Sequence, residues 1–233
     1  MESESANINP LLAAQGICRN FGTSEGNLEV LKGVNLNVYS GDMAVVVGES
    51  GVGKSTLLHI LGGLDRPTQG TLMVDGQSFI DKSETELARF RNKNIGFVFQ
   101  HHYLLEDFTA LENTMMPGLI AGMSKIDASE TAEQLLTDVG LKDRMKHRPK
   151  QLSGGEQQRV AVARALANMP KIVIADEPSG NLDIKTGEKL HQLLARLNET
   201  KGVTFLIATH NLDLAQSCRR VVKLEGGLVS EAA

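Results

Sequence analysis

Gly48-Glu49-Ser50-Gly51-Val52-Gly53-Lys54-Ser55 follows the apolar run 43–47 and leads into a second apolar segment that begins at Leu57. The pattern G-x-x-x-x-G-K-[ST] between a buried strand and a helix is typical of a loop that cradles phosphate groups. Its glycines let the backbone curl so that N–H groups point at phosphate oxygens, and the helix N-terminus adds a positive dipole end. The alternative, a glycine-rich turn with an incidental lysine, is disfavoured by the strand and helix on either side.

Lys54 and Ser55 are the side chains of this loop that phosphate chemistry needs. We expect the Lys54 ammonium to neutralise the β- and γ-phosphates of a nucleoside triphosphate, and the Ser55 hydroxyl to ligate Mg²⁺. The residues predicted to surround the nucleotide here are Gly48, Glu49, Ser50, Gly51, Val52, Gly53, Lys54, Ser55 and Thr56.

The segments around the loop predict alternating strands and helices. Val34, Leu36 and Val38 alternate with polar residues before the turn 40–42, which predicts a hairpin that feeds the buried strand 43–47. A second hairpin is predicted at 71–74, because the dipeptide 75–76, Asp-Gly, suits a tight turn. Helical spacing dominates 81–152, and the runs 172–175, 185–197 and 203–208 predict strand, helix and strand of a mostly parallel sheet.

Two carboxylates, Asp176 and Glu177, follow the apolar run 172–175. A parallel sheet presents its ligands at the carboxyl ends of its strands, so both acids are predicted to face the bound phosphates. We expect Asp176 to bind Mg²⁺ and Glu177 to orient and deprotonate a water that attacks the γ-phosphate in line. A solvated acidic turn before Pro178 is the alternative, and the phosphate loop weakens it.

A third signal is a short polar turn before the helix predicted over 156–167. Ser153 could simply be the N-cap of that helix. The same uncapped N–H groups can hold an anion, so the residues alone leave both interpretations open. The turn reads Leu152-Ser153-Gly154-Gly155-Glu156-Gln157.

Together these three segments resemble the ABC (ATP-binding cassette) ATPase family, whose signature motif the turn 152–157 resembles, and the likeness covers nearly the whole chain. The resemblance implies an ATPase that uses ATP and Mg²⁺. It implies an α/β fold of the P-loop NTPase (RecA-like) class, a mostly parallel sheet with an N-terminal antiparallel β subdomain and an inserted helical subdomain. It also implies one ABC ATPase domain over 1–233, with a core lobe of 1–98 and 159–233 and a helical subdomain of 99–158.

The resemblance assigns further roles. Gln100 looks like the Q-loop glutamine, which binds nucleotide and Mg²⁺, 179–183 looks like the D-loop, and His210 looks like the switch histidine, catalytic together with Lys54 and Glu177. A single Gln or His after a strand is more often a surface or core residue, and only order and spacing favour these roles. The family implies a head-to-tail homodimer in which one subunit closes over ATP held by the other, using Ser153, Gly154 and Gly155.

Two residues depart from the family pattern. Phe21 stands where many relatives place Tyr for stacking on adenine, so the stacking face is retained and a hydroxyl contact is lost. Glu156 stands in the signature where Gln is commoner, and we expect little change in catalysis.

A finer likeness lies in the segments 57–65, 99–105 and 107–113, which resemble the ATP-binding subunits of the bacterial lipoprotein-releasing (Lol) system. This implies an ATPase that powers lipoprotein release from the inner membrane toward the outer membrane and touches the cargo only indirectly. Its implied partners are integral membrane permease subunits of the Lol type, and its implied location is peripheral, on the cytoplasmic face of the bacterial inner membrane. Macrolide-exporter and cell-division ABC ATPases share the pattern 179–183 and remain alternatives. We expect His101 and His102 to be solvated.

Composition excludes other classes of function. The formal net charge of 24 basic against 28 acidic residues is -4, so the chain offers no overall basic field and we expect no nucleic-acid partner. The basic stretch 142–150 is interrupted by Asp143 and lacks aromatic residues, which favours a solvated face. Residues 1–7 carry no Lys or Arg, so we expect no secretory signal, and the apolar runs are too short to span a membrane.

Overall fold

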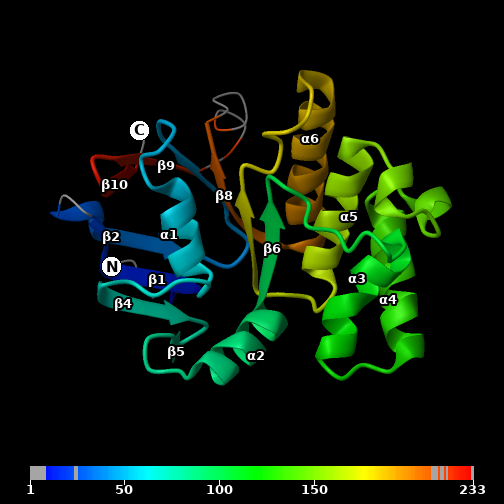
Figure 1. Cartoon of the computed structure of the whole chain (residues 1–233), viewed down its shortest axis with the longest axis horizontal. Helices are drawn as coiled ribbons and strands as arrows, with labels where there is room; N and C mark the ends of the chain where they lie inside the picture. The colour runs from blue at the N-terminus through cyan, green and yellow to red at the C-terminus, as the bar shows by residue number, and fades with distance from the viewer. Residues whose placement is uncertain (1–8, 24–25, 211–214, 216–217, 219, 232–233) are drawn as a thin grey trace, which may run out of the picture.

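The computed structural model describes residues 9–23, 26–210, 215, 218 and 220–231. Strands and helices are interspersed along this part of the chain (Figure 1). In order they are β1 (Leu12–Thr23), β2 (Gly26–Val38), β3 (Met43–Val47), α1 (Lys54–Leu61), β4 (Gln69–Val74), β5 (Gln77–Ser78), α2 (Glu84–Asn94), β6 (Ile95–Phe99), α3 (Ala110–Ile120), α4 (Lys125–Asp138), η1 (Lys142–Arg144), η2 (Pro149–Gln151), α5 (Gly154–Leu166), β7 (Ile172–Asp176), α6 (Ile184–Lys201), β8 (Thr204–Thr209), β9 (Arg220–Glu225) and β10 (Leu228–Glu231).

Two sheets organise these elements. The larger has the strand order β10-β9-β3-β8-β7-β6, in which β9, β3, β8, β7 and β6 run parallel and β10 is antiparallel to β9. The smaller is antiparallel, with the order β2-β1-β4-β5. The predicted α/β class, with a mostly parallel sheet and an N-terminal antiparallel sheet, is confirmed.

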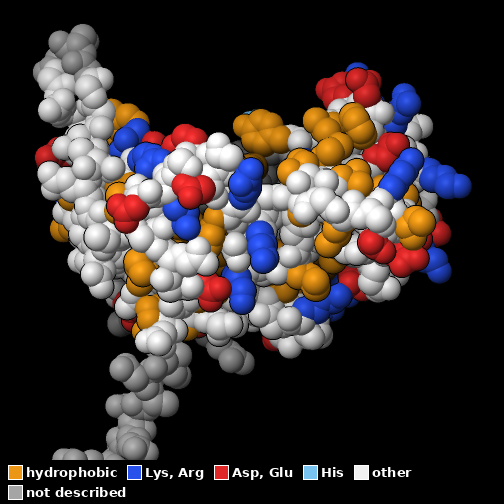
Figure 2. Space-filling view, turned by 90° about the horizontal axis from the view of Figure 1, so that it is seen from below, with side chains coloured by type: hydrophobic (Ala, Val, Ile, Leu, Met, Phe, Trp, Pro, Cys, Tyr) orange, Lys and Arg blue, Asp and Glu red, His pale blue; other side chains and the backbone are white. Residues whose placement is uncertain are grey.

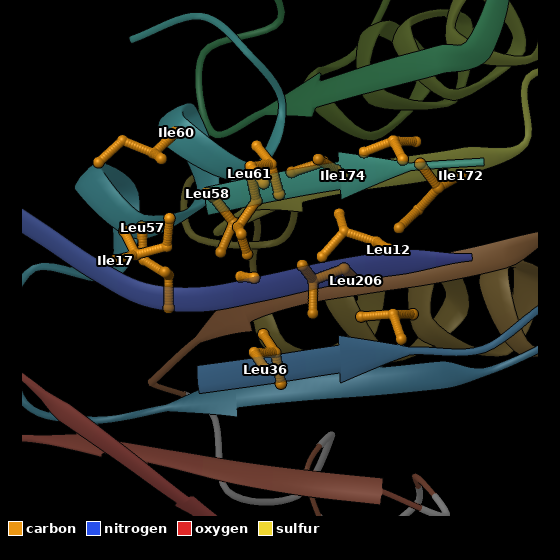
Figure 3. Close-up of a cluster of buried hydrophobic side chains, with 14 of the residues drawn as sticks. Leu12, Ile17, Leu36, Leu57, Leu58, Ile60, Leu61, Ile172, Ile174 and Leu206 are labelled. Carbon is orange, nitrogen blue, oxygen red and sulfur yellow. The ribbon is translucent and has the colours of Figure 1, made fainter. Parts of the chain in front are cut away.

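The central strands of the larger sheet, β3, β8 and β7, have buried apolar side chains on both faces. On β7, Ile172 and Ile174 join one core with α1 and the antiparallel sheet, as Figure 3 shows for neighbouring side chains of that cluster. Val173 and Ala175 point to the opposite face and join a second core with α5 and α6. This alternation follows from the two-residue period of a strand. It leaves α1 on one side of the sheet and α5 and α6 on the other (Figure 1).

Helix α6 illustrates how local sequence selects an element. Asp183 caps its N-terminus by accepting from the Thr186 N–H, and Gly202 ends it in a left-handed conformation with φ of 65°. Its buried residues recur at intervals of three and four positions and therefore form one face, whose leucines belong to the second core. They are Gly187, Leu190, Leu193, Leu194 and Leu197.

A helical lobe follows β6. Helix α3 packs on both α4 and α5, and a small separate cluster around Met115, Ala128 and Ala132 holds α3 and α4 together. The inserted helical subdomain is confirmed, while its boundaries at 99 and 158 remain a prediction.

One prediction for the N-terminal half is wrong. The strand 26–38 and the strand Met43–Val47 do not form a hairpin, because β2 pairs with β1 while β3 lies in the other sheet between β8 and β9. The helical pattern predicted for 81–152 is present in α2, α3 and α4, but within this stretch Ile95–Phe99 forms β6, the parallel neighbour of β7. Helix and buried strand both give short apolar runs, so periodicity could not separate them there. The hairpin at Asp75-Gly76 is confirmed by the pairing of β4 with β5.

Within the described part of the chain, no helix combines the length and apolar character that a membrane span requires. Figure 2 shows the face seen from below Figure 1, where Lys and Arg side chains are interspersed with Asp and Glu side chains.

Candidate functional site

The loop 48–53 joins β3 to α1 and needs glycine for two different reasons. A Cβ atom on Gly48 would lie 2.5 Å from the Leu224 carbonyl oxygen, so only glycine fits this close approach to β9. Gly53 is the N-cap of α1 and has a φ of 107°, a conformation that favours glycine. The N-terminal N–H groups of α1 therefore have no side-chain cap from this residue, as an anion site requires.

Lys54 is the buried cation of this loop. Its side chain is only 7% exposed, and the Nζ donates to the carbonyl oxygens of Gly48 at 2.8 Å and Glu49 at 3.0 Å. The Nζ also lies 3.8 Å from Glu177 Oε1. A buried ammonium needs such partners, and here they hold the charge inside the curl of the loop.

Asp176, the last residue of β7, has a buried carboxylate oxygen without a protein partner. Its Oδ1 makes no hydrogen bond, although unpaired buried polar atoms are rare in folded proteins. Burial raises the pKa of Asp176, while a hydrogen bond from Ser55 and the nearby His59 act to lower it. A divalent cation beside Ser55 would satisfy the orphaned oxygen, so these residues fit Mg²⁺.

A magnesium ion at this position would need ligands from the nucleotide as well. In the described residues, no cluster of three or more His, Cys, Asp and Glu side chains is arranged to hold a metal ion. Mg²⁺ is commonly held by one or two carboxylates together with substrate phosphates. The donor set of Ser55 and Asp176 therefore suits a metal that arrives with the triphosphate.

Asp176→Asn should stabilise the nucleotide-free protein. The raised pKa means that the ionised carboxylate weakens folding at pH 7, a penalty that disappears as pH falls below the folded and then the unfolded pKa. We expect the melting temperature at pH 7 to rise, because the neutral amide does not carry this penalty. We also expect MgATP to raise the melting temperature of the wild type, and the variant should lose this further rise. Differential scanning calorimetry measures both effects.

The exposed Asp143→Asn provides a matched control, because it removes a carboxylate without touching the candidate site. A lower melting temperature of nucleotide-free Asp176→Asn, or an unchanged response to MgATP, would contradict the role of Asp176.

Glu177 adopts a backbone conformation that is unusual for its type, with φ of 45°. Its Oε2 accepts from His210 Nδ1 at 2.9 Å and from Thr209 Oγ1 at 3.2 Å. The side chain is only 15% exposed, while that of His210 is 68% exposed. The structure therefore brings Lys54, Asp176, Glu177 and His210 to one edge of the sheet. Sequence reasoning missed Thr209, and its place at the end of β8, beside the end of β7, was the available signal.

Gln100 forms hydrogen bonds with the loop that follows β7. Its Nε2 donates to Asn181 Oδ1 at 2.9 Å, and Asn181 Nδ2 donates back to the Gln100 carbonyl at 3.1 Å. Asn181 Nδ2 also lies 3.4 Å from His101 Nδ1. His102 is half-buried with its Nδ1 against Gln158 Oε1, so the expectation of a solvated His102 is wrong.

Ser153 is the N-cap of α5, and its capping box is complete. Its Oγ accepts from the Glu156 N–H at 3.3 Å, and its own N–H donates to Glu156 Oε2 at 2.8 Å. A Cβ on Gly155 would lie 2.4 Å from Thr186 Cγ2, so α5 packs closely on α6 here. Because α1 and α5 lie on opposite sides of the sheet, this turn does not meet the phosphate loop of its own chain (Figure 1).

Phe21 lies on β1 with its side chain 37% exposed. The Arg19 guanidinium carbon lies 4.6 Å from the centre of the ring, a cation–π contact. Arg19 is itself held by Asp65 at 2.9 Å and by the Arg66 carbonyl, so the contact comes from a fixed side chain. The partly exposed ring can stack on a planar base.

Residues 31–180 match a family model described as ABC transporter. The lipoprotein-releasing system ATP-binding protein LolD of Geobacter metallireducens is 51% identical over 222 residues, covering 95% of this chain and 99% of that protein. LolD of Bacteroides thetaiotaomicron is 49% identical, covering 95% of this chain and 100% of that protein.

Solved structures resemble this one over the same span. The dimeric bacterial ABC transporter cassette MJ0796 superposes with a TM-score of 0.87 at 41% identity, covering 95% of this chain and 97% of that chain. A post-hydrolysis state of MJ0796, bound to ADP and Pi, gives the same values.

Proposed function

The chain belongs to the ABC transporter family, and from this premise we propose that it is the ATP-hydrolysing subunit of a lipoprotein-releasing system. The observation that carries the proposal is the 51% identity with a LolD protein over 95% of the chain. The buried lysine and the paired acids at one sheet edge supply the chemistry that such a subunit needs.

ATP would bind through the backbone of the loop 48–53, with Lys54 neutralising the β- and γ-phosphates and Phe21 stacking on the adenine. Ser55 and Asp176 would hold Mg²⁺, with Gln100 as a further ligand once its contact with Asn181 opens. An ion held by these residues would supply positive charge to offset the negative charge of the phosphates.

Glu177 would act as the general base for the attacking water. The proposal is supported by the 2.9 Å contact with His210 Nδ1, which donates to Oε2 and fixes the orientation of the carboxylate. Thr209 donates to the same oxygen, while Oε1 lies 3.8 Å from Lys54 Nζ, on the side where the phosphates would bind. A base held within hydrogen-bond reach of its proton typically contributes about 10²- to 10⁴-fold to the rate.

We propose that two copies assemble head to tail, so that Ser153, Gly154 and Gly155 of one subunit close over ATP held by the other. The proposal is supported by the exposed turn of Ser153, which lies away from the phosphate loop of its own chain. The dimer would bind integral permease subunits of the Lol type at the cytoplasmic face of the inner membrane. ATP can drive this closure because it binds the closed dimer more tightly than the open one.

Co-purification from bacterial membranes tests the proposal. A tagged copy of the chain, extracted in mild detergent, should bring down an integral membrane pair with large periplasmic domains. The purified complex in proteoliposomes should then release a lipoprotein to a soluble acceptor only when ATP is present. Recovery of a partner bound to a cell-wall hydrolase, or release that does not depend on ATP, would overturn the lipoprotein assignment.

A further inference from the structure

The signature turn 152–157 carries a negative charge, Glu156, close to where the proposed function requires it to bind a phosphate. Glu156 lies in the first turn of α5, and its Oε2 accepts from the Ser153 N–H. Carboxylates are favourable at a helix N-terminus because they complement the positive dipole end. In the proposed dimer, however, the γ-phosphate of the partner's ATP must use the same positive end. An uncompensated Glu156 would repel it.

Arg144 supplies the compensation. Its Nε donates to Glu156 Oε1 at 3.0 Å, leaving Oε2 for the Ser153 N–H. The Glu156 side chain is 20% exposed and that of Arg144 is 46% exposed, so the pair is partly shielded from water. Contacts with Ser153 and with Arg144 lower the pKa of Glu156, in keeping with a carboxylate that stays ionised.

The guanidinium comes from a segment that the helical lobe holds in place. Arg144 ends η1, where its N–H donates to the Leu141 carbonyl at 2.9 Å and its carbonyl accepts from the His147 N–H at 2.9 Å. The next residues bind the start of α3, because Leu111 N–H donates to the Met145 carbonyl at 2.9 Å. The charge of Arg144 is thus anchored beside α5 from outside that helix.

We propose that Arg144 is a positioning residue for ATP binding, acting through Glu156 on the signature serine. It neutralises Glu156 and keeps the carboxylate on the Ser153 N–H, so the Ser153 hydroxyl and the neighbouring glycine N–H groups face an incoming phosphate without net repulsion. The inference rests on the proposed function, because it concerns the composite site of the dimer. It also explains why Glu can stand where a neutral Gln would otherwise serve.

A purely structural salt bridge would behave differently. Partly exposed ion pairs contribute little to folding, so losing this one should change the melting temperature by no more than about 2 °C. The charge effect on phosphate binding should instead depend on whether residue 156 is charged. A double-mutant cycle between the two positions separates these possibilities.

The experiment compares Arg144→Gln, Glu156→Gln and the double variant in steady-state hydrolysis of MgATP. Arg144→Gln in the wild-type background should raise the KM for MgATP about fivefold to tenfold, with a smaller change in kcat. The same substitution in the Glu156→Gln background should change the KM by less than about twofold, because no charge is left to compensate. ATP-dependent dimerisation, measured by analytical ultracentrifugation, should require a higher MgATP concentration in each variant whose KM is raised.

Two further variants sharpen the test. Arg144→Lys keeps the positive charge and should recover most of the lost affinity. Lys142→Gln removes a neighbouring positive charge from η1 and should leave the KM within about twofold of wild type, since Lys142 is not the partner of Glu156. Should Arg144→Gln lower the melting temperature, Arg144→Met, which retains an apolar stem, replaces it in the same cycle.

Equal effects of Arg144→Gln in both backgrounds would overturn the proposal in favour of a structural role, and no effect in either would remove Arg144 from the site. Both outcomes leave the proposed function intact as long as the wild-type protein hydrolyses MgATP. A wild-type protein without magnesium-dependent hydrolysis would count against the proposed function instead.

Discussion

Glu177→Gln should retain ATP binding while its hydrolysis falls by roughly 10²- to 10⁴-fold, the usual contribution of a positioned general base. Gln matches Glu in size and can still accept hydrogen bonds from Thr209 and His210, so the geometry at the end of β7 should be preserved. The amide cannot take a proton from water. Phosphate release measures the turnover, and equilibrium binding of a fluorescent ATP analogue measures the affinity.

The same variant should accumulate as an ATP-bound dimer, because hydrolysis is what reopens the closed state in the proposed cycle. Size-exclusion chromatography with and without MgATP detects this shift. Glu188→Gln, which removes an exposed carboxylate from α6, controls for the loss of a negative charge. Turnover of Glu177→Gln within a few-fold of the Glu188→Gln control would remove Glu177 from the role of base.

Mixed dimers of Lys54→Ala and Ser153→Ala should depend strongly on how the two changes are distributed. With one change on each subunit, one composite site keeps both an intact phosphate loop and an intact signature turn, so about half of the wild-type activity should remain. With both changes on one subunit, each site lacks one component, and activity should fall by about 100-fold or more. The prediction follows from α1 and α5 lying on opposite sides of the sheet.

Differently tagged subunits allow each mixed dimer to be purified, and the nucleotide retained after desalting reports the number of closed sites. We expect one nucleotide per dimer for the first arrangement and none for the second. If each chain formed its site alone, the pattern would reverse, because only the dimer with an unaltered subunit would retain nucleotide. That reversed pattern would contradict the shared site.

Local sequence determines the phosphate loop, the two acids at the end of β7 and the N-terminal cap of α5. The phosphate loop requires glycine where its backbone comes close to β9 and where φ is positive. Gly48 meets the first requirement, and Gly51 and Gly53 meet the second. Asp176 and Glu177 follow an uninterrupted apolar run, which is how a strand buried on both faces reads. Ser153 and Glu156 form a capping box whose two members lie three positions apart. Such features can be predicted from the sequence because each depends on residues that lie only a few positions apart.

Tertiary structure decided the contacts between segments that lie far apart along the chain. Strand order sent β2 and β3 into different sheets, although turn and alternation signals resembled a hairpin. The parallel register of β7 and β8 set Thr209 and His210 beside Glu177, and packing left Asp176 Oδ1 buried without a protein partner. Arg144 contacts Glu156 because backbone hydrogen bonding to the start of α3 holds the segment that follows η1 in place. Sequence determines which residues can do the chemistry, and packing decides which of them meet, because burial and pairing depend on distant partners that local periodicity does not encode.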